Sequence, residues 1–158
     1  MQVRRATPDD RPWIAEVVTA EFASTKLVSR GRLLEDASVL DGFIVENDGR
    51  PVGCALWHEI EGDAELAVIA TTYRGAGAGT ALLDAVVDHA RANGWKRLWL
   101  VTTNDNTDAL RLYQRAGWDW VAWHRDSVTA ARPLKPELPR LGAHGIAIRH
   151  ELELEYPL

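Results

Sequence analysis

A short glycine-rich stretch has the residue types needed to hold an anion. It reads Arg74-Gly75-Ala76-Gly77-Ala78-Gly79-Thr80 and lies between a predicted strand and a predicted helix. The first amides of a helix have no partner within the helix, and the positive end of the helix dipole lies at the same place. Small side chains let the backbone approach an anion closely, and Arg74 can add a charge-assisted hydrogen bond. The stretch therefore predicts a site for a pyrophosphate.

Two common nucleotide-binding motifs do not fit this turn. A P-loop needs lysine and then serine or threonine after its last glycine, but Gly79 is followed by Thr80 and Ala81. A Rossmann fingerprint needs the spacing Gly-x-Gly-x-x-Gly between parallel strands. Here glycines alternate with alanines, and the preceding strands are predicted to be antiparallel. Another nucleotide phosphate, or a turn without a ligand, stays open at this point.

The elements before the turn follow from the spacing of apolar residues. We expect a short strand near Val3, a helix over residues 8–22 and a weaker helix over residues 27–40. Three antiparallel strands should then follow, because Asp48-Gly49 and the turn at Gly62 separate apolar runs in the way typical of hairpins.

The elements after the turn alternate between helix and strand. We expect a helix that ends at Asn93-Gly94, then, in order, strand 97–102, helix 107–116, strand 118–124, an irregular connection over 127–145 and a last strand over 145–155. The strand, turn, helix and strand around the glycine-rich stretch should form a right-handed crossover. Strict alternation in the last strand predicts one apolar face and one charged face, the charged one made of Arg149, Glu151, Glu153 and Glu155.

The glycine turn and a second stretch together resemble the GNAT family of N-acetyltransferases. The family signature for acetyl-coenzyme A is Arg or Gln, two residues, Gly, one residue, then Gly or Ala, which residues 74–79 match directly after Tyr73. The second signature is matched by Asn106-Thr107-Asp108-Ala109, Leu112-Tyr113 and Gly117-Trp118. The resemblance covers the order of elements along nearly the whole chain. It implies an α/β fold with a mixed, mostly antiparallel sheet of about seven strands, splayed in the middle, with helices on both faces.

The resemblance also implies roles for residues outside the turn. The backbone of Ile69 and Ala70 would pair with the pantetheine arm of acetyl-coenzyme A where the central strands splay, and Asn106 would contact the arm from the other side. Acyl transfer to an amine needs a neutral amine, a polarised carbonyl and a proton for the departing thiolate. Tyr113 stands where the family places its general acid, so we expect its phenol to protonate or hydrogen-bond the sulfur. The alternative is a tyrosine that only packs on the apolar face of its helix.

The general base has no fixed place in the family, where it is often a glutamate or an ordered water on the strand before the turn. Glu65 lies on that strand, and its alternation with Ala67 and Ile69 would place all three on the face that lines the cleft. We expect Glu65 to act as the base or through a water; the alternative is a solvated carboxylate at a sheet edge. Weaker candidates are Glu59, His58, His124 and His150.

Cys54 could serve a covalent route, but its small neighbours indicate an inert thiol in core packing. We therefore expect direct transfer, with no enzyme nucleophile and no metal. Trp57 and Trp123 could line an aromatic acceptor pocket, although burial in the core or in an interface is the usual place for tryptophan.

Composition excludes several classes of protein. The 158 residues suit one domain, and 18 Lys plus Arg against 23 Asp plus Glu give a formal net charge of −5, which disfavours a sequence-independent nucleic-acid binder. A single cysteine allows no disulfide within the chain. Neither a signal peptide nor a run of ~20 apolar residues is evident, so we expect no membrane association and a cytoplasmic protein.

The sequence thus predicts an N-acetyltransferase that moves an acetyl group from acetyl-coenzyme A to a primary amine in a ternary complex. The amine could belong to a small molecule, a peptide or a protein. The alternative is a non-catalytic module of the same fold that binds or senses acyl-coenzyme A. In this fold the acceptor loops come from about residues 22–40 and 127–145, which carry no motif that selects an amine. The last strands could also form a homodimer interface.

Overall fold

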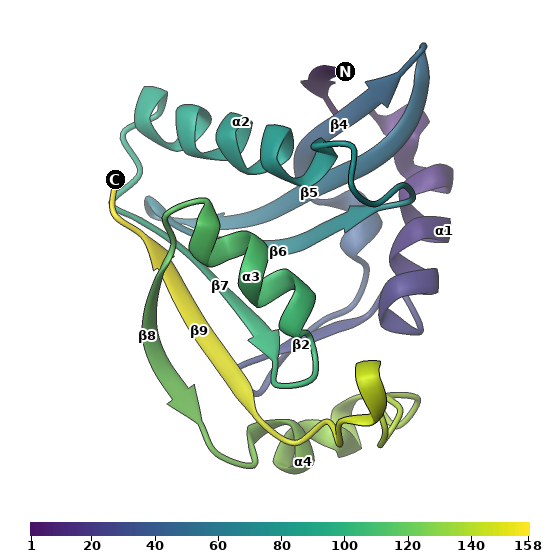
Figure 1. Ribbon diagram of the computed structural model, residues 1–158, viewed down its shortest axis with the longest axis vertical. Coiled ribbons are helices and arrows are strands. Elements are labelled where there is room, and N and C mark those ends of the chain that lie inside the picture. Colours follow the sequence, from purple (N-terminus) through teal and green to yellow (C-terminus); the bar gives the residue numbers. More distant parts are fainter.

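A seven-stranded sheet forms the centre of the computed structural model, which describes residues 1–158 (Figure 1). Its spatial order is β1-β4-β5-β6-β7-β9-β8. The strands are β1 Gln2–Arg5, β4 Asp41–Asn47, β5 Arg50–Ile60, β6 Asp63–Thr71, β7 Arg97–Thr103, β8 Asp119–His124 and β9 Glu151–Tyr156. Only β6 and β7 pair in parallel. This confirms the mixed, mostly antiparallel sheet.

Helices cover both faces of the sheet, as expected (Figure 1). They are α1 Arg11–Phe22, α2 Ala78–Ala92, α3 Thr107–Arg115 and the short α4 Ser127–Ala131. One core cluster joins the apolar stripes of α2 and α3 to the sheet, and a second joins Ile14, Val17 and Val18 of α1 to the opposite face. No helix is long and apolar enough to cross a membrane.

Tight turns join the first three long strands. Asp48 and Gly49 both have positive φ, and so do Glu61 and Gly62. Two successive residues of this kind are typical of the two-residue turns whose twist matches that of the flanking strands. The predicted run of three antiparallel strands is confirmed.

The helix predicted over residues 27–40 is wrong. The segment forms a two-stranded hairpin, β2 Leu27–Ser29 and β3 Arg32–Leu34, followed by a 3-10 turn over Ala37–Val39. The reason lies in Arg30 and Gly31, whose φ angles of 51° and 75° make a tight hairpin turn and interrupt any helix. The apolar residues of this segment have a spacing that also fits a helix, which led to the wrong prediction.

The last strand begins later than predicted. Residues before Glu151 bond to the preceding connection instead, since Gly142 donates to the carbonyl of Ile146 and Ile148 donates to that of Arg140. Glu151, expected on a charged outer face, is only 3% exposed because the β2–β3 hairpin and α4 cover it. The connection 127–145 is largely irregular, as predicted, apart from α4 and two 3-10 turns.

Candidate active site

The sheet splits between its two parallel strands. β6 pairs with β7 only where Asp63, Ala64 and Glu65 lie beside Arg97, Leu98 and Trp99. Beyond this point β6 stays paired with β5 up to Thr71, and β7 stays paired with β9 up to Thr103. The two strands therefore diverge toward their carboxyl ends and leave the facing edge of β6 unpaired around Ile69 and Ala70. This confirms the splayed centre.

A β-bulge in β6 lies just inside the split. Leu56 pairs with Val68, but the next residue of β5, Trp57, pairs with Leu66, so Ala67 is an extra residue. Leu66 consequently packs in the α2 and α3 core, whereas Val68 packs in the α1 core. The predicted alternation of Glu65, Ala67 and Ile69 on one face is therefore wrong. Glu65 faces the α1 side of the sheet and Ile69 the α2 side.

The glycine turn has the shape of an anion site. Gly75 and Gly77 have φ of 82° and 80°, a conformation that residues with a side chain rarely adopt, and Gly77 caps the start of α2. Ala81 is the first residue of the helix whose amide bonds back, to the carbonyl of Gly77. The amides of Ala78, Gly79 and Thr80 thus have no helical partner. Gly79 has a second role, because a Cβ there would lie 3.0 Å from Leu112 of α3.

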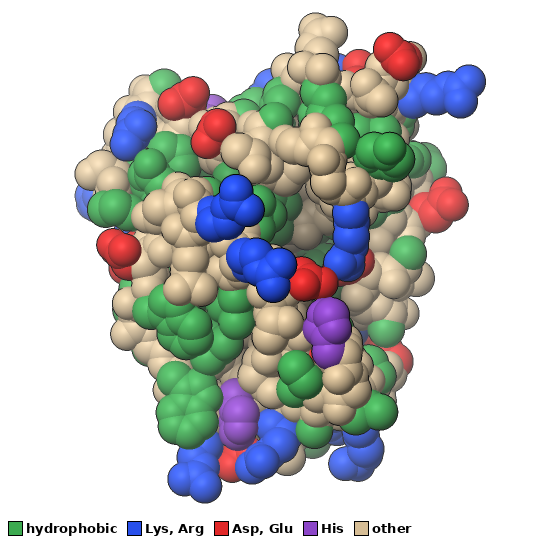
Figure 2. All heavy atoms as spheres, in the orientation of Figure 1, with side chains coloured by type: hydrophobic (Ala, Val, Ile, Leu, Met, Phe, Trp, Pro, Cys, Tyr) green, Lys and Arg blue, Asp and Glu red, His purple; other side chains and the backbone are tan.

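Arg74 forms an ion pair from the glycine turn to α3, on the other side of the split. Its guanidinium pairs with Asp108 in the first turn of α3 at 3.0 Å, and Nε2 of His144 lies 3.3 Å from the same carboxylate. The hydrogen bond with His144, together with Arg74, lowers the pKa of Asp108. Basic side chains ring a hollow on this face of the molecule (Figure 2). An incoming phosphate would compete with Asp108 for Arg74.

Asn106 and Tyr113 lie on the α3 side of the split. The amide Nδ2 of Asn106 donates to the hydroxyl of Thr102 at 3.1 Å. Tyr113 is 5% exposed and belongs to the core under α2 and α3, with its ring 6.2 Å from that of Trp118. Burial, with the nearby charge of Glu21, raises the pKa of Tyr113 above its ordinary value. Burial thus favours the neutral phenol over the phenolate.

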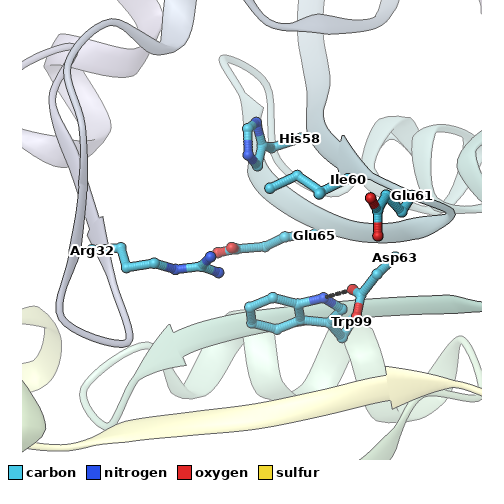
Figure 3. Close-up of a pocket in the computed structure, with 7 residues that line it drawn as sticks. All are labelled: Arg32, His58, Ile60, Glu61, Asp63, Glu65 and Trp99. Carbon is cyan, nitrogen blue, oxygen red and sulfur yellow. Dashed lines mark hydrogen bonds between the residues drawn. The ribbon is translucent and has the colours of Figure 1, made fainter.

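A cavity of about 350 Å³ opens on the other face, at the closed end of the split (Figure 3). It is lined by Arg32, His58, Ile60, Glu61, Asp63, Glu65 and Trp99. Asp63 holds the indole of Trp99 by a hydrogen bond of 2.5 Å from Nε1. The lining comes from the β2–β3 hairpin, from β5, β6 and the turn that joins them, and from β7 (Figure 3).

Glu65 points into this cavity toward Arg32 (Figure 3). Burial raises the pKa of Glu65, and the nearby hydroxyl of Ser29 and the positive charges of Arg32 and His58 offset part of that rise. Such a carboxylate holds a proton better than an exposed one, which suits a group that must take a proton from an ammonium ion.

Residues 8–118 match the acetyltransferase (GNAT) family. The chain belongs to this family. Across 115 residues it is 39% identical to the uncharacterized protein YdhI of Bacillus subtilis, covering 72% of this chain and 71% of the relative. Over 105 residues it is 36% identical to an amino-acid acetyltransferase of Ralstonia nicotianae, covering 64% of this chain but 23% of that longer relative.

The fold of this acetyltransferase also matches solved GNAT structures. A GNAT family acetyltransferase from Elizabethkingia anophelis, solved with acetyl-coenzyme A bound, superposes with a TM-score of 0.71 at 18% identity. The match covers 99% of this chain and 97% of that one. The fold implied by the sequence resemblance is therefore confirmed.

Most of the weaker candidate bases lie away from the cavity of this acetyltransferase. Only His58 joins Glu65 in lining it. Glu59 is exposed, His124 pairs with Glu153 at 3.1 Å, and Nδ1 of His150 accepts the backbone amide of Asp126 at 2.8 Å.

The cysteine and the two tryptophans fall outside the cavity too. Cys54 is fully buried in the α1 core, and burial raises its pKa to about 12, so its thiol is inert. Trp57 packs in the core 4.8 Å from the ring of His89. Trp123 is 54% exposed on the edge strand β8.

Sequence reasoning missed two residues that line the cavity of this acetyltransferase. Arg32 falls within the helix wrongly predicted over residues 27–40, although Arg30-Gly31 could have indicated the hairpin turn. Trp99 lies in the predicted strand 97–102, and no local signal distinguishes a tryptophan that packs in a sheet from one that also lines a cavity.

Proposed function

We propose that the protein transfers the acetyl group of acetyl-coenzyme A directly to a primary amine. The observation that carries this proposal is the arrangement around the split. The glycine turn and Tyr113 lie on the α2 and α3 side, whereas Glu65 and its cavity lie on the α1 side. Two substrates can thus approach one point from opposite faces of the sheet, as a ternary complex requires.

Acetyl-coenzyme A would lie along the opened edge of β6. The backbone at Ile69 and Ala70 is available to pair with the pantetheine arm, and Asn106 can contact it across the split. The pyrophosphate would bind the turn from Arg74 through Gly75, Ala76, Gly77, Ala78 and Gly79 to Thr80, where free amides and the helix dipole favour an anion. Bound in this way, the co-substrate supplies an activated acetyl thioester.

Glu65 would remove a proton from the acceptor ammonium, directly or through a water. The neutral nitrogen then attacks the thioester carbonyl, a carbon–nitrogen bond forms and the carbon–sulfur bond breaks. Tyr113 donates its proton to the departing thiolate. Protons balance, because the ammonium loses two: the first goes to the Glu65 carboxylate, and the second, released once the carbon–nitrogen bond has formed, restores the Tyr113 phenol whose proton went to the sulfur.

Ligand binding and turnover test this proposal in sequence. Acetyl-coenzyme A and coenzyme A at ~100 times their dissociation constants should each add about 2.7 kcal/mol to the free energy of unfolding, whereas ATP and NAD should add none. Release of coenzyme A thiol is then followed with a panel of primary amines. Stabilisation by coenzyme A without turnover of any amine would favour a binding or sensing module. Stabilisation by ATP or NAD alone would overturn the proposal.

A further inference from the structure

Arg32 is an unpaired cation at the edge of the acceptor cavity. The nearby Arg30, by contrast, already has a partner in the protein, since its backbone amide and its guanidinium both bind Glu151. No carboxylate lies within 4.0 Å of the Arg32 guanidinium, which instead points across the cavity toward Glu65 (Figure 3). A guanidinium in a cleft presents a rigid fork of donors that matches the two oxygens of a carboxylate.

The cavity therefore presents one acidic and one basic group to the same small volume. Glu65 suits an ammonium ion that must lose a proton, and Arg32 suits a carboxylate. From this juxtaposition we propose that the acceptor is a free amino acid, with its amine at Glu65 and its carboxylate at Arg32. The inference rests on the proposed acetyl transfer and specifies the substrate class of the same site.

The walls and the size of the cavity suit such a ligand. A volume of about 350 Å³ lies at the small end of the ~300–1,000 Å³ range of small-molecule sites. Trp99, oriented by Asp63, and Ile60 provide apolar surface for a side chain. A lysine side chain or a protein N-terminus carries no free carboxylate next to its amine, so Arg32 discriminates against both.

The products follow from the same chemistry. The amino group loses one proton to Glu65 and, when its nitrogen has bonded to the acetyl carbon, a second that restores the Tyr113 phenol after the thiolate has taken the tyrosine proton. The reaction yields an N-acetylamino acid and coenzyme A. The carboxylate takes no part in the bond changes, so Arg32 acts on binding and orientation.

The test compares each amino acid with its α-carboxamide, which has nearly the same size but lacks the negative charge. We expect kcat/KM of the wild type to favour the acid at least tenfold. Arg32→Gln should reduce this preference at least tenfold, mainly through KM. Arg32→Lys should keep part of the preference, because lysine keeps the positive charge but lacks the paired donors of a guanidinium. Arg11→Gln, at an exposed arginine of α1, is the matched control.

Two results would overturn the inference: equal use of acid and carboxamide by the wild type, or an acid preference that Arg32→Gln leaves intact. Failure of the proposed function is a different outcome, in which no amine releases coenzyme A. Calorimetric titration of amino acids and their carboxamides into the coenzyme A complex, with wild type and Arg32→Gln, still tests the carboxylate site in that case. Equal binding of acid and carboxamide there would overturn it.

Discussion

Two glutamates on either side of the β2–β3 hairpin have opposite surroundings. Glu151 of β9 accepts hydrogen bonds from the Arg30 amide at 3.1 Å and from the hydroxyl of Ser127, and its charge is met by the Arg30 guanidinium at 3.6 Å. Glu65 of β6 faces a cavity, with no ion pair within 4.0 Å, and burial raises its pKa. A carboxylate surrounded by donors stabilises the fold, whereas one left without them is available to a ligand.

The same contrast separates other buried polar groups. Asp105 accepts from Thr103 at 2.5 Å and from the amide of Ala143 at 3.0 Å, which ties the connection before β9 to the end of β7. Gly142 is required there, because a Cβ would clash with the Asp105 carboxylate. Tyr113, by contrast, is buried in the core under α2 and α3, and its hydroxyl makes no hydrogen bond. Asp105 thus holds two segments together, whereas the hydroxyl of Tyr113 has no hydrogen-bond partner within the protein.

Removing the cavity carboxylate should have the largest effect. Glu65→Gln should lower kcat by about 10²- to 10⁴-fold, the usual contribution of a general base, while the melting temperature stays the same or rises. Steady-state thiol release and thermal unfolding measure the two effects. Glu59→Gln, on the neighbouring strand and exposed, is the control. Unchanged kcat in Glu65→Gln would remove the proposed distinction between the two glutamates.

Removing the hydroxyl of Tyr113 should have the second-largest effect on turnover. Tyr113→Phe removes only the proton donor from a buried ring, so we expect kcat to fall more than tenfold with little change in the dissociation constant of coenzyme A. Turnover and calorimetric titration of coenzyme A test this together. Equal turnover of variant and wild type would show that Tyr113 only packs in the core.

Replacing Glu151, which has several hydrogen-bond donors around it, should lower stability, in contrast to replacing Glu65. Glu151→Ala leaves the Arg30 amide and the Ser127 hydroxyl without their acceptor, so the free energy of unfolding should fall by about 1–3 kcal/mol. Each kcal/mol should lower the melting temperature by roughly 2–4 °C in a chain of this size. Glu155→Ala, which removes a more exposed pair with Arg97, should cost less than about 1 kcal/mol. A larger loss in Glu155→Ala than in Glu151→Ala would contradict this ranking.

The dependence on pH should give the smallest and most specific effect. Because burial raises the pKa of Glu65, kcat/KM should rise with pH along a limb centred above the ordinary glutamate value of ~4.3, and Glu65→Gln should abolish that limb.

Stability should change in the opposite direction. The folded state holds the Glu65 proton more tightly than the unfolded state, so this residue's stabilisation is complete below ~4.3 and is lost as pH rises through the folded-state pKa. Chemical denaturation of wild type and Glu65→Gln across pH measures this. A limb of kcat/KM that persists in Glu65→Gln would show that another group controls it.

Local signals determined much of this protein in advance. Paired turn residues, the periodicity of α2 and the spacing of the two signatures were sufficient for the three antiparallel strands β4, β5 and β6, the crossover and the family, because each depends on residues close in sequence. The glycine turn was predictable for the same reason, since positive φ at Gly75 and Gly77 is a property of the local backbone.

Only the tertiary structure decided what faces the cavity. A single extra residue at Ala67 reversed the side-chain alternation along β6, and it arises from pairing with β5, which no local pattern of β6 records. Arg32 and Trp99 are far apart in sequence and meet at the cavity because the hairpin folds over the closed end of the split. The surroundings of Glu65 and Glu151 likewise differ through long-range packing: both are acidic residues in predicted strands, and only their neighbours in space separate the group available to a ligand from the group that holds the fold.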